Sequence, residues 1–194
     1  VGGKAIMTSD SHERASDRTA EAMTFIENEN GEKVDIVVMV QGDEPMIQPS
    51  MIEESLAPFH DPSIQVVNLM SKIESVEEFE DPNEVKVVVD KNSNAMYFSR
   101  EPIPSRKKGI DDVPMLKQVC IIPFRRDYLL KFNSMNETNL EIIESVDMMR
   151  ILENGEEVRM VMTDCTSFSV DTLDDLKRVE AAMKNDPLMN TYIA

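Results

Sequence analysis

The pattern of apolar and polar residues divides the chain into short strands that alternate with helices. The clearest strand is predicted at residues 36–40, five consecutive apolar residues that are mostly β-branched, a pattern typical of a strand buried on both faces of a parallel sheet. The run ends at Gln41-Gly42-Asp43-Glu44-Pro45, where glycine allows a tight backbone and proline ends the strand. Two carboxylates therefore follow a central strand, at the position where open α/β sheets bind ligands.

The remaining apolar segments also alternate in type. Strands are predicted at residues 4–8, 66–70, 85–90, 95–100, 119–124, 157–163 and 168–170, with 85–90 and 95–100 as an antiparallel hairpin. Helices are predicted at residues 19–26, with Ser16 or Asp17 as N-cap, and at 50–59, 76–79, 126–132, 140–152 and 172–183. This alternation predicts an α/β fold, a three-layer mostly parallel sheet with one antiparallel insertion. No repeat or linker is visible, so residues 1–194 are predicted to form a single domain.

Composition and charge argue against several kinds of partner. The chain has 37 acidic and 20 basic residues and a formal net charge of −17, which argues against nucleic acid because phosphate binding needs a basic face. No apolar run reaches membrane-spanning length and no signal peptide is visible, so no membrane partner is expected. Cys120 and Cys165 have no spacing that suits a disulfide framework or a zinc site, which favours a reducing compartment.

Two carboxylates are the first candidates for chemistry. Asp43 and Asp171 lie far apart in sequence, yet each follows an apolar segment at the expected carboxyl end of a strand. Two such groups converging on one point would make a hard-oxygen site suited to Mg²⁺, which usually bridges to substrate phosphates. For Asp171, a cap of the helix that starts at Thr172 is an equally good interpretation. For Glu44 a structural role at the turn is favoured over metal binding.

Cations near the predicted strand ends could balance an anionic substrate. They are Arg14, Arg18, Lys86, Arg100 and Lys117. Any one of them alone is more often a solvated or ion-paired side chain. As a set they could offset a triphosphate and a sugar carboxylate, because arginine binds a carboxylate through two parallel hydrogen bonds.

The sequence segments around these residues resemble those of the CMP-KDO synthetases, the 3-deoxy-manno-octulosonate cytidylyltransferases. Residues 41–45 (QGDEP) match the family signature in full, and Ala15-Ser16-Asp17-Arg18 stands where the family has a nucleotide-contacting Gly-Thr-Asp/Glu-Arg element. Further similar segments follow in the family's order at residues 81–88, 95–100, 103–104, 144–155 and 170–172. The resemblance covers nearly the whole chain and implies a fold like that of the nucleotide-diphospho-sugar transferases.

The resemblance implies a reaction and its metal. The anomeric hydroxyl of an acidic 2-keto sugar, KDO or a related one, would attack the α-phosphorus of CTP, and pyrophosphate would leave. Asp43 and Asp171 would hold Mg²⁺ where the α-phosphate meets the sugar, which agrees with phosphoryl-type transfer being mostly positioning and charge stabilisation. The implied setting is lipopolysaccharide precursor synthesis in the bacterial cytoplasm.

The resemblance also implies substrate contacts. Ser16, Arg18 and Gln41 would lie around the nucleotide or where it meets the sugar, and Arg100 would favour the anionic sugar and belong with the catalytic residues. A homodimer is implied, with its interface near residues 97–104.

The substrate pocket departs from the family pattern at three places. A sugar-facing histidine is replaced by Gln118, a sugar-facing tyrosine by Phe124, and a Glu-Gln pair by Asp147-Met148. Losing a ring nitrogen, a phenol hydroxyl and an amide removes hydrogen bonds that select polyhydroxy sugars. We therefore expect either a sugar other than KDO or relaxed selectivity.

The family also opens with a strand and a basic, glycine-containing loop that wraps the triphosphate, and residues 1–194 contain no such loop. We expect the chain to be N-terminally incomplete and, as it stands, to bind CTP weakly and turn over slowly. Two other interpretations remain open. One is a sugar-nucleotide-dependent glycosyltransferase with Asp43 in a metal role, and the other is a non-catalytic homologue that acts as a binding or assembly module.

Overall fold

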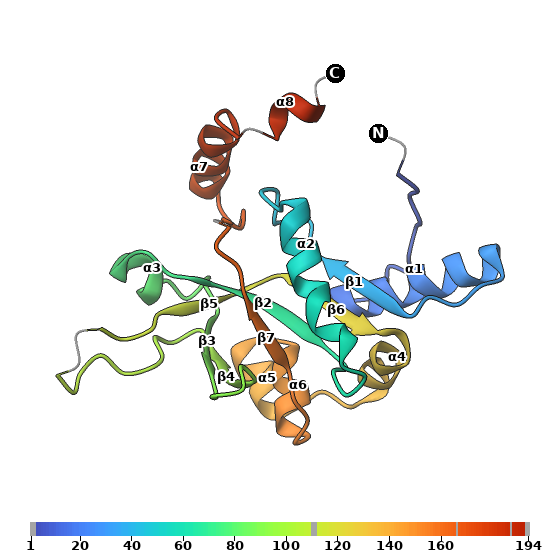
Figure 1. Ribbon diagram of the computed structural model, residues 1–194, viewed down its shortest axis with the longest axis horizontal. Coiled ribbons are helices and arrows are strands. Elements are labelled where there is room, and N and C mark those ends of the chain that lie inside the picture. Colours follow the sequence, from blue (N-terminus) through green and yellow to red (C-terminus); the bar gives the residue numbers. More distant parts are fainter. Residues whose placement is uncertain (1–2, 110–111, 166, 187, 193–194) are drawn as a thin grey trace.

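In the described part of the chain the strands form two hydrogen-bonded sheets (Figure 1). The structure is a computed structural model that describes residues 3–109, 112–165, 167–186 and 188–192. In one sheet, β1 (Ile36–Val40) pairs antiparallel with β6 (Ile121–Arg125). The other has the order β4-β3-β5-β2-β7, made of β2 (Val67–Lys72), β3 (Lys86–Val89), β4 (Ala95–Ser99), β5 (Leu116–Val119) and β7 (Arg159–Met162).

The two sheets are joined through β5 and β6, which are separated only by Cys120. β2 pairs antiparallel with β5 and parallel with β7, and a bridge between Val66 and Phe124 links the start of β2 to β6. Because β1 is antiparallel to β6, the strands β1, β2 and β7 all run in the same direction. Their carboxyl ends therefore lie at one edge of the sheet, as the sequence predicted.

The α/β class and the antiparallel β3–β4 hairpin are confirmed, while the pairing is more mixed than the predicted mostly parallel sheet. The strand predicted at residues 119–124 lies between β1 and β2 and runs against both. Hydrophobic periodicity determines which positions are buried and carries no information on strand direction, which explains the difference.

Helices cover both faces of the sheet, which confirms the three layers. One face carries α2 (Pro49–Leu56) and the 3₁₀ turn η1 (Ala57–His60), and the other carries α1 (Ala15–Asn30), α4 (Arg126–Ser134) and α6 (Met148–Glu153). The remaining helices are α3 (Val76–Glu80), α5 (Asn139–Glu144), α7 (Leu173–Met183) and α8 (Met189–Tyr192). Figure 1 shows α7 and α8 reaching away from the sheet. None of the helices in the described part of the chain is long and apolar enough to cross a membrane.

Alternation along β2 and the residue before it explains why both faces need a cover. Val67 packs with Phe59 of η1 and Leu69 packs with Met51 of α2. Val66 and Met70, which point to the other face, belong to the larger cluster under α4 and α6. Successive side chains of a strand point to opposite faces, so a strand that is apolar throughout requires helices on both.

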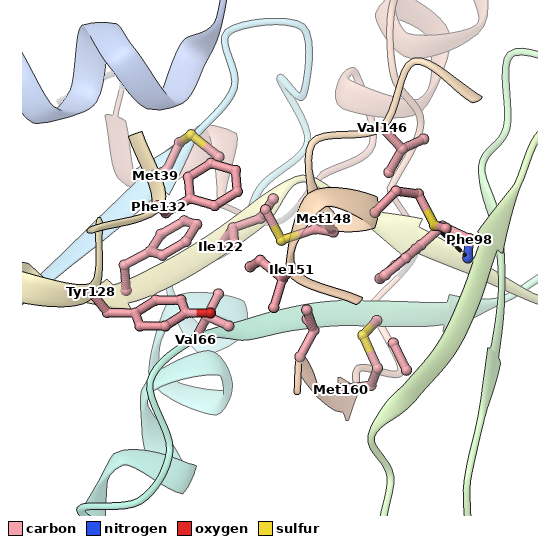
Figure 2. Packing of buried hydrophobic residues seen from close by; sticks show 14 of the residues in the cluster. Met39, Val66, Phe98, Ile122, Tyr128, Phe132, Val146, Met148, Ile151 and Met160 are labelled. Atoms are coloured by element: carbon pink, nitrogen blue, oxygen red, sulfur yellow. Dashed lines mark hydrogen bonds between the residues drawn. The ribbon is translucent and has the colours of Figure 1, made fainter. Parts of the chain in front are cut away.

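The larger cluster is the main core of the protein. Figure 2 shows Met39 of β1, Ile122 of β6, Phe132 of α4 and Ile151 of α6 converging there. Each such side chain is almost fully buried, which stabilises the fold by about 1.5–3 kcal/mol per large apolar side chain. The core thus fixes the ends of β1 and β6 relative to the connection between α5 and α6.

Two predicted strands and one predicted helix are wrong. Residues 4–8 and 168–170 are not strands, because neither segment joins a ladder in the described part of the chain. The helix predicted at residues 140–152 is divided into α5 and α6. Ser145 adopts a left-handed conformation with φ of 52°, which ends α5, and serine gives little sequence signal for that conformation.

The predicted N-cap of α1 is also wrong. Arg14 occupies the N-cap position and makes no side-chain capping bond. Ser16 lies inside the first turn, and its hydroxyl donates to Asp147 at 3.3 Å. The cap was mispredicted because a serine near a helix start usually bonds the backbone, whereas this one bonds a distant carboxylate.

Candidate functional site

A cavity of about 180 Å³ opens at the edge of the sheet where β1 ends. Its wall combines the exit of β1, the turn before β3, the end of β4, the β5–β6 junction, the α5–α6 connection and the segment before α7. Seven of the residues predicted from the sequence line it: Gln41, Asp43, Arg100, Gln118, Asp147, Met148 and Asp171. Three do not, namely Ser16, Arg18 and Phe124.

The two predicted metal-binding carboxylates are brought together. The backbone N–H of Val170 donates to the carbonyl oxygen of Asp43 at 2.9 Å, which attaches the segment before α7 to the exit of β1. Asp43 and Asp171 both line the cavity and both are exposed. Asp43 and Asp171 are far apart in sequence, and this backbone hydrogen bond holds their two segments side by side.

The capping interpretation of Asp171 is wrong. Thr172 is the N-cap of α7, and its hydroxyl accepts from the N–H of Asp175 in a reciprocal capping box. The Asp171 carboxylate instead accepts a hydrogen bond from the Ser169 hydroxyl at 3.1 Å. Since the helix start is satisfied without it, this carboxylate is available to a ligand.

Glu44 has the structural role expected for it. Its side chain is 8% exposed, and its oxygens accept from the backbone N–H of Cys120 at 3.3 Å and from the Ser167 hydroxyl at 2.6 Å. These bonds tie the exit of β1 to the β5–β6 junction on one side and to the segment leading to Asp171 on the other. Glu44 thus holds the scaffold of the two aspartates.

Cys120 lines the cavity but is not suited to nucleophilic chemistry. Burial, helped by the nearby charges of Glu44 and Asp43, raises the pKa of the Cys120 thiol far above its ordinary value. A thiol that stays protonated at neutral pH is a poor nucleophile. The structure therefore argues against a nucleophilic role for Cys120.

Arg100 is the cation that lines the cavity among the described residues. Its guanidinium donates to three carbonyl oxygens, those of Glu144 at 2.7 Å, Pro82 at 2.9 Å and Ser145 at 3.4 Å. It forms no ion pair within the described part of the chain. Its position is therefore fixed by neutral groups, and its charge remains available to an anionic ligand.

The other predicted cations are engaged elsewhere. Lys86 is fully buried and donates to the carbonyl oxygens of Asp81, Glu84 and Arg100. Lys117 is 4% exposed and pairs with Glu78 at 2.7 Å and with Glu84 at 3.1 Å. These two lysines therefore bond internal carboxylates and carbonyl oxygens, and they do not line the cavity that Arg100 lines.

Arg14 and Ser16 act on the cavity indirectly, through Asp147. Arg14 donates to the Asp147 carboxylate at 2.6 Å, and the Ser16 hydroxyl donates to it at 3.3 Å. Burial raises the pKa of Asp147, and the charge of Arg14 opposes that rise. Arg14 and Ser16 thereby position a cavity residue without lining the cavity themselves.

Arg18 and Phe124 do not reach the cavity. Arg18 donates to Thr8 and to the carbonyl oxygens of Ser9 and His12, which holds the segment before α1. Phe124 is fully buried in the main core, with its ring centroid 5.8 Å from that of Phe132. The structure therefore offers no substrate contact at Phe124.

Sequence reasoning missed Asn68. This residue is fully buried in β2, and its amide bonds the side chain of Gln118 at the cavity wall. The signal was a single polar residue within the apolar run at residues 66–70. Buried polar side chains usually have a specific partner, so the interruption itself could have drawn attention to this position.

The donor set at the cavity suits one kind of metal. No group of three or more histidine, cysteine, aspartate or glutamate side chains is arranged to hold a metal among the described residues, so a closed protein cage is absent there. Mg²⁺ is commonly bound by one or two carboxylates together with water and substrate phosphates. Asp43 and Asp171 fit that chemistry.

Comparisons with known proteins agree on one family. The sequence model of the family described as cytidylyltransferase matches residues 1–158. The chain is 42% identical over 189 residues to a 3-deoxy-manno-octulosonate cytidylyltransferase of Geobacter metallireducens, an alignment that covers 92% of this chain and 72% of the relative. It is 39% identical over 195 residues to the protein of that name in Trichlorobacter lovleyi, covering 95% of this chain and 75% of the relative.

Among solved structures, CMP:2-keto-3-deoxy-manno-octonic acid synthetase complexed with CTP superposes with a TM-score of 0.82 and 38% identity. That match covers 94% of this chain and 73% of the other. The fold is thereby confirmed as that of the nucleotidyltransferases, over nearly all of this chain.

Proposed function

This chain belongs to the cytidylyltransferase family, and on that premise we propose that it transfers CMP from CTP to 3-deoxy-manno-octulosonate (KDO). It is a nucleotidyltransferase, and the reaction releases pyrophosphate. The observation that carries the proposal is that Asp43 and Asp171 line one cavity, with the backbone N–H of Val170 bonded to the carbonyl oxygen of Asp43. The similarity to 3-deoxy-manno-octulosonate cytidylyltransferases favours this function over a glycosyltransferase or a non-catalytic module.

The reaction needs positioning and charge neutralisation more than covalent help from the protein. The anomeric oxygen of the sugar forms a bond to the α-phosphorus of CTP, the bond from that phosphorus to the bridging oxygen of the β-phosphate breaks, and the hydroxyl proton is released. Charge grows on the phosphate oxygens during this in-line displacement. Asp43, Asp171 and Arg100 line this cavity and would provide anchoring points for both reactants.

We assign the metal site to Asp43 and Asp171. The bound Mg²⁺ would supply charge neutralisation at the α-phosphate. The two carboxylates hold their places through the Val170–Asp43 backbone bond and the Ser169–Asp171 side-chain bond. Glu44 supports the segments that carry both aspartates, through its hydrogen bonds with Cys120 and Ser167, and we place it outside the coordination shell.

We assign the sugar carboxylate to Arg100. The guanidinium is held by three carbonyl oxygens and lacks a carboxylate partner among the described side chains. An anionic substrate therefore does not have to displace an internal ion pair, which would cost free energy. Gln41 and Gln118 supply neutral hydrogen-bonding groups near the same cavity.

Pyrophosphate release tests the proposal directly. The folded chain is incubated with CTP, Mg²⁺ and one of several acidic 2-keto sugars, and ATP, GTP and UTP replace CTP in matched reactions. We expect release that requires CTP, Mg²⁺ and an acidic 2-keto sugar together, with KDO as one of the sugars accepted. Release that is equal with all four nucleotides, or that proceeds without an acidic sugar, contradicts the proposal.

We further propose a homodimer and a cytoplasmic setting. β4 is an edge strand, and Met96 on it is 62% exposed, while Ile143 on the nearby α5 is 73% exposed. Exposed apolar side chains at an open sheet edge favour association. Sedimentation of the wild type and of Met96→Lys tests the dimer, with loss of the dimer expected for the variant.

Cys120 and Cys165 are free thiols, which suits a reducing compartment.

A further inference from the structure

Asn68 is a buried amide between two apolar residues on one side of its strand. Val66, just before β2, and Met70 point to the same side and belong to the main core, and Asn68 itself is 0% exposed. An amide buried in such surroundings lowers stability unless its polar atoms are hydrogen-bonded. The partners of Asn68 therefore show what the amide contributes at this position.

The NH₂ group of Asn68 is used on the backbone. Nδ2 donates to the carbonyl oxygen of Val119 at 2.7 Å and to that of Leu69 at 3.0 Å. Val119 ends β5, at the junction where the chain passes through Cys120 into β6. If the amide were turned over, Oδ1 would face two carbonyl oxygens, so only one orientation satisfies these contacts.

The orientation of Asn68 determines that of Gln118. Because Asn68 Oδ1 can only accept, Gln118 must direct its Nε2 toward it, and this hydrogen bond is formed. Gln118 Oε1 is on the other branch of the same amide, and none of the described residues donates to it. Since Gln118 lines the cavity with Asp43 and Asp171, an oriented hydrogen-bond acceptor is available at the cavity wall.

We propose that Asn68 is a positioning residue that holds Gln118 Oε1 as an acceptor for a hydroxyl group of the sugar. The inference rests on the proposed function and extends it, because it states which hydrogen-bonding polarity the pocket selects at one point. A sugar hydroxyl donates to this oxygen. An analogue that carries only an acceptor there, such as a methyl ether, meets an unfavourable pair of oxygens and leaves Gln118 unpaired.

A purely structural role for Asn68 has to be separated from this one. Asn68 also satisfies the Val119 carbonyl, so its replacement lowers stability whether or not it positions Gln118. Asn94 provides a matched control, because it is also a buried asparagine, 7% exposed, whose Oδ1 accepts a side-chain hydrogen bond, from Arg159 at 2.8 Å. Asn94 does not line the cavity.

The first test observes Gln118 itself and needs no turnover. The chain has four glutamines, so ¹⁵N-glutamine labelling gives few side-chain amide signals, and Gln118→Met identifies the signal of Gln118. We expect the Gln118 NH₂ protons to exchange slowly with solvent in the wild type and rapidly in Asn68→Leu, while the other glutamine signals stay in place. Rapid exchange in the wild type overturns the proposal.

The second test separates the two substrates by pyrophosphate-release kinetics. We expect Asn68→Leu to raise the KM for the sugar about tenfold, the factor for one neutral hydrogen bond, with the KM for CTP unchanged. Asn94→Leu should lower the unfolding midpoint and leave both KM values unchanged. The double variant Asn68→Leu/Gln118→Met should be no worse in sugar KM than Gln118→Met alone.

The outcomes distinguish this proposal from the proposed function. If wild type releases no pyrophosphate with any acidic sugar, the proposed function fails, and the exchange experiment still decides whether Asn68 orients Gln118. If wild type is active and Asn68→Leu changes only stability, or raises both KM values equally, the positioning role is wrong. Should Asn68→Leu fail to fold, monodeoxy sugars replace it. One of these analogues should bind wild type more weakly than KDO does, and should bind Gln118→Met as tightly as KDO does. If removing each hydroxyl weakens binding equally in the two proteins, the proposal is overturned.

Discussion

Glu44 is next to Asp43 in the sequence, and replacing it tests whether its carboxylate supports the fold or binds the metal. The side chain is buried, and both of its oxygens are occupied, by the N–H of Cys120 and the hydroxyl of Ser167. Glu44→Ala removes both acceptors and leaves two buried donors without partners. Glu44→Gln keeps one carbonyl oxygen for Cys120, and its NH₂ group can donate to Ser167 once that hydroxyl rotates.

The size of the effect follows from the two hydrogen bonds. A bond to a charged group contributes about 1.5–3 kcal/mol, and the 3.3 Å bond to Cys120 belongs at the weak end. Because neighbouring bonds do not add fully, we expect Glu44→Ala to lower the free energy of unfolding by about 2–4 kcal/mol. For a chain of this size that corresponds to a fall in Tm of about 5–15 °C. Glu44→Gln should cost about 1 kcal/mol or less.

The assay combines urea unfolding with Mg²⁺-dependent pyrophosphate release. We expect Glu44→Ala to lose stability and turnover together, and Glu44→Gln to keep most of both. Asp43→Asn is the matched comparison, because Asp43 is exposed and its replacement should reduce turnover on the order of 100-fold with little change in stability. A Glu44→Gln protein of normal stability that loses turnover as completely as Asp43→Asn would refute the structural role and place Glu44 at the metal.

Two further predictions concern ion pairs away from the cavity. Glu141 and Arg150 form a bidentate pair at 2.6 and 2.8 Å, with Glu141 0% and Arg150 6% exposed, so Arg150→Leu should lower the free energy of unfolding by about 3–5 kcal/mol; a loss below about 1 kcal/mol in urea unfolding would contradict this. Hydrogen bonds from Arg126 lower the pKa of Glu27 from 4.5 to about 2. This pair therefore stabilises the fold above pH 4.5 and loses its contribution as the pH falls toward 2. Glu27→Gln should reduce the loss of stability across that interval, and urea midpoints that fall with pH as steeply as in the wild type would show that the pair contributes nothing.

The parts of the fold that the sequence predicted are those that hydrophobic periodicity determines. The apolar run at residues 36–40 is β1, and the hairpin predicted at residues 85–100 is β3–β4. Strand direction and helix breaks were beyond that reasoning. β6 runs against β1, and Ser145 ends α5 in a left-handed conformation, and both features depend on tertiary packing.

The candidate site was predictable where it follows strand ends. Asp43 follows β1, as predicted, whereas Asp171 lies well beyond the end of β7 and reaches the same cavity through the backbone hydrogen bond from Val170 to Asp43. Phe124 was misplaced, although it shares its strand face with Ile122, and both are core residues. Alternation of side chains along a strand could have predicted that placement. The role of Asn68 needed the hydrogen-bond polarity of its three partners, which only the structure provides.

The central claim is that Asp43 and Asp171 act as one metal site during CMP transfer. A double-mutant cycle in Mg²⁺-dependent pyrophosphate release, with CTP and KDO, tests it most directly. Asp43→Asn and Asp171→Asn should each reduce kcat/KM on the order of 100-fold. The double variant should have a kcat/KM no lower than that of either single variant. Two ligands of one metal ion act as a unit, so removing the second ligand causes no further loss. Near wild-type turnover in either single variant, or losses that multiply in the double variant, would contradict the account.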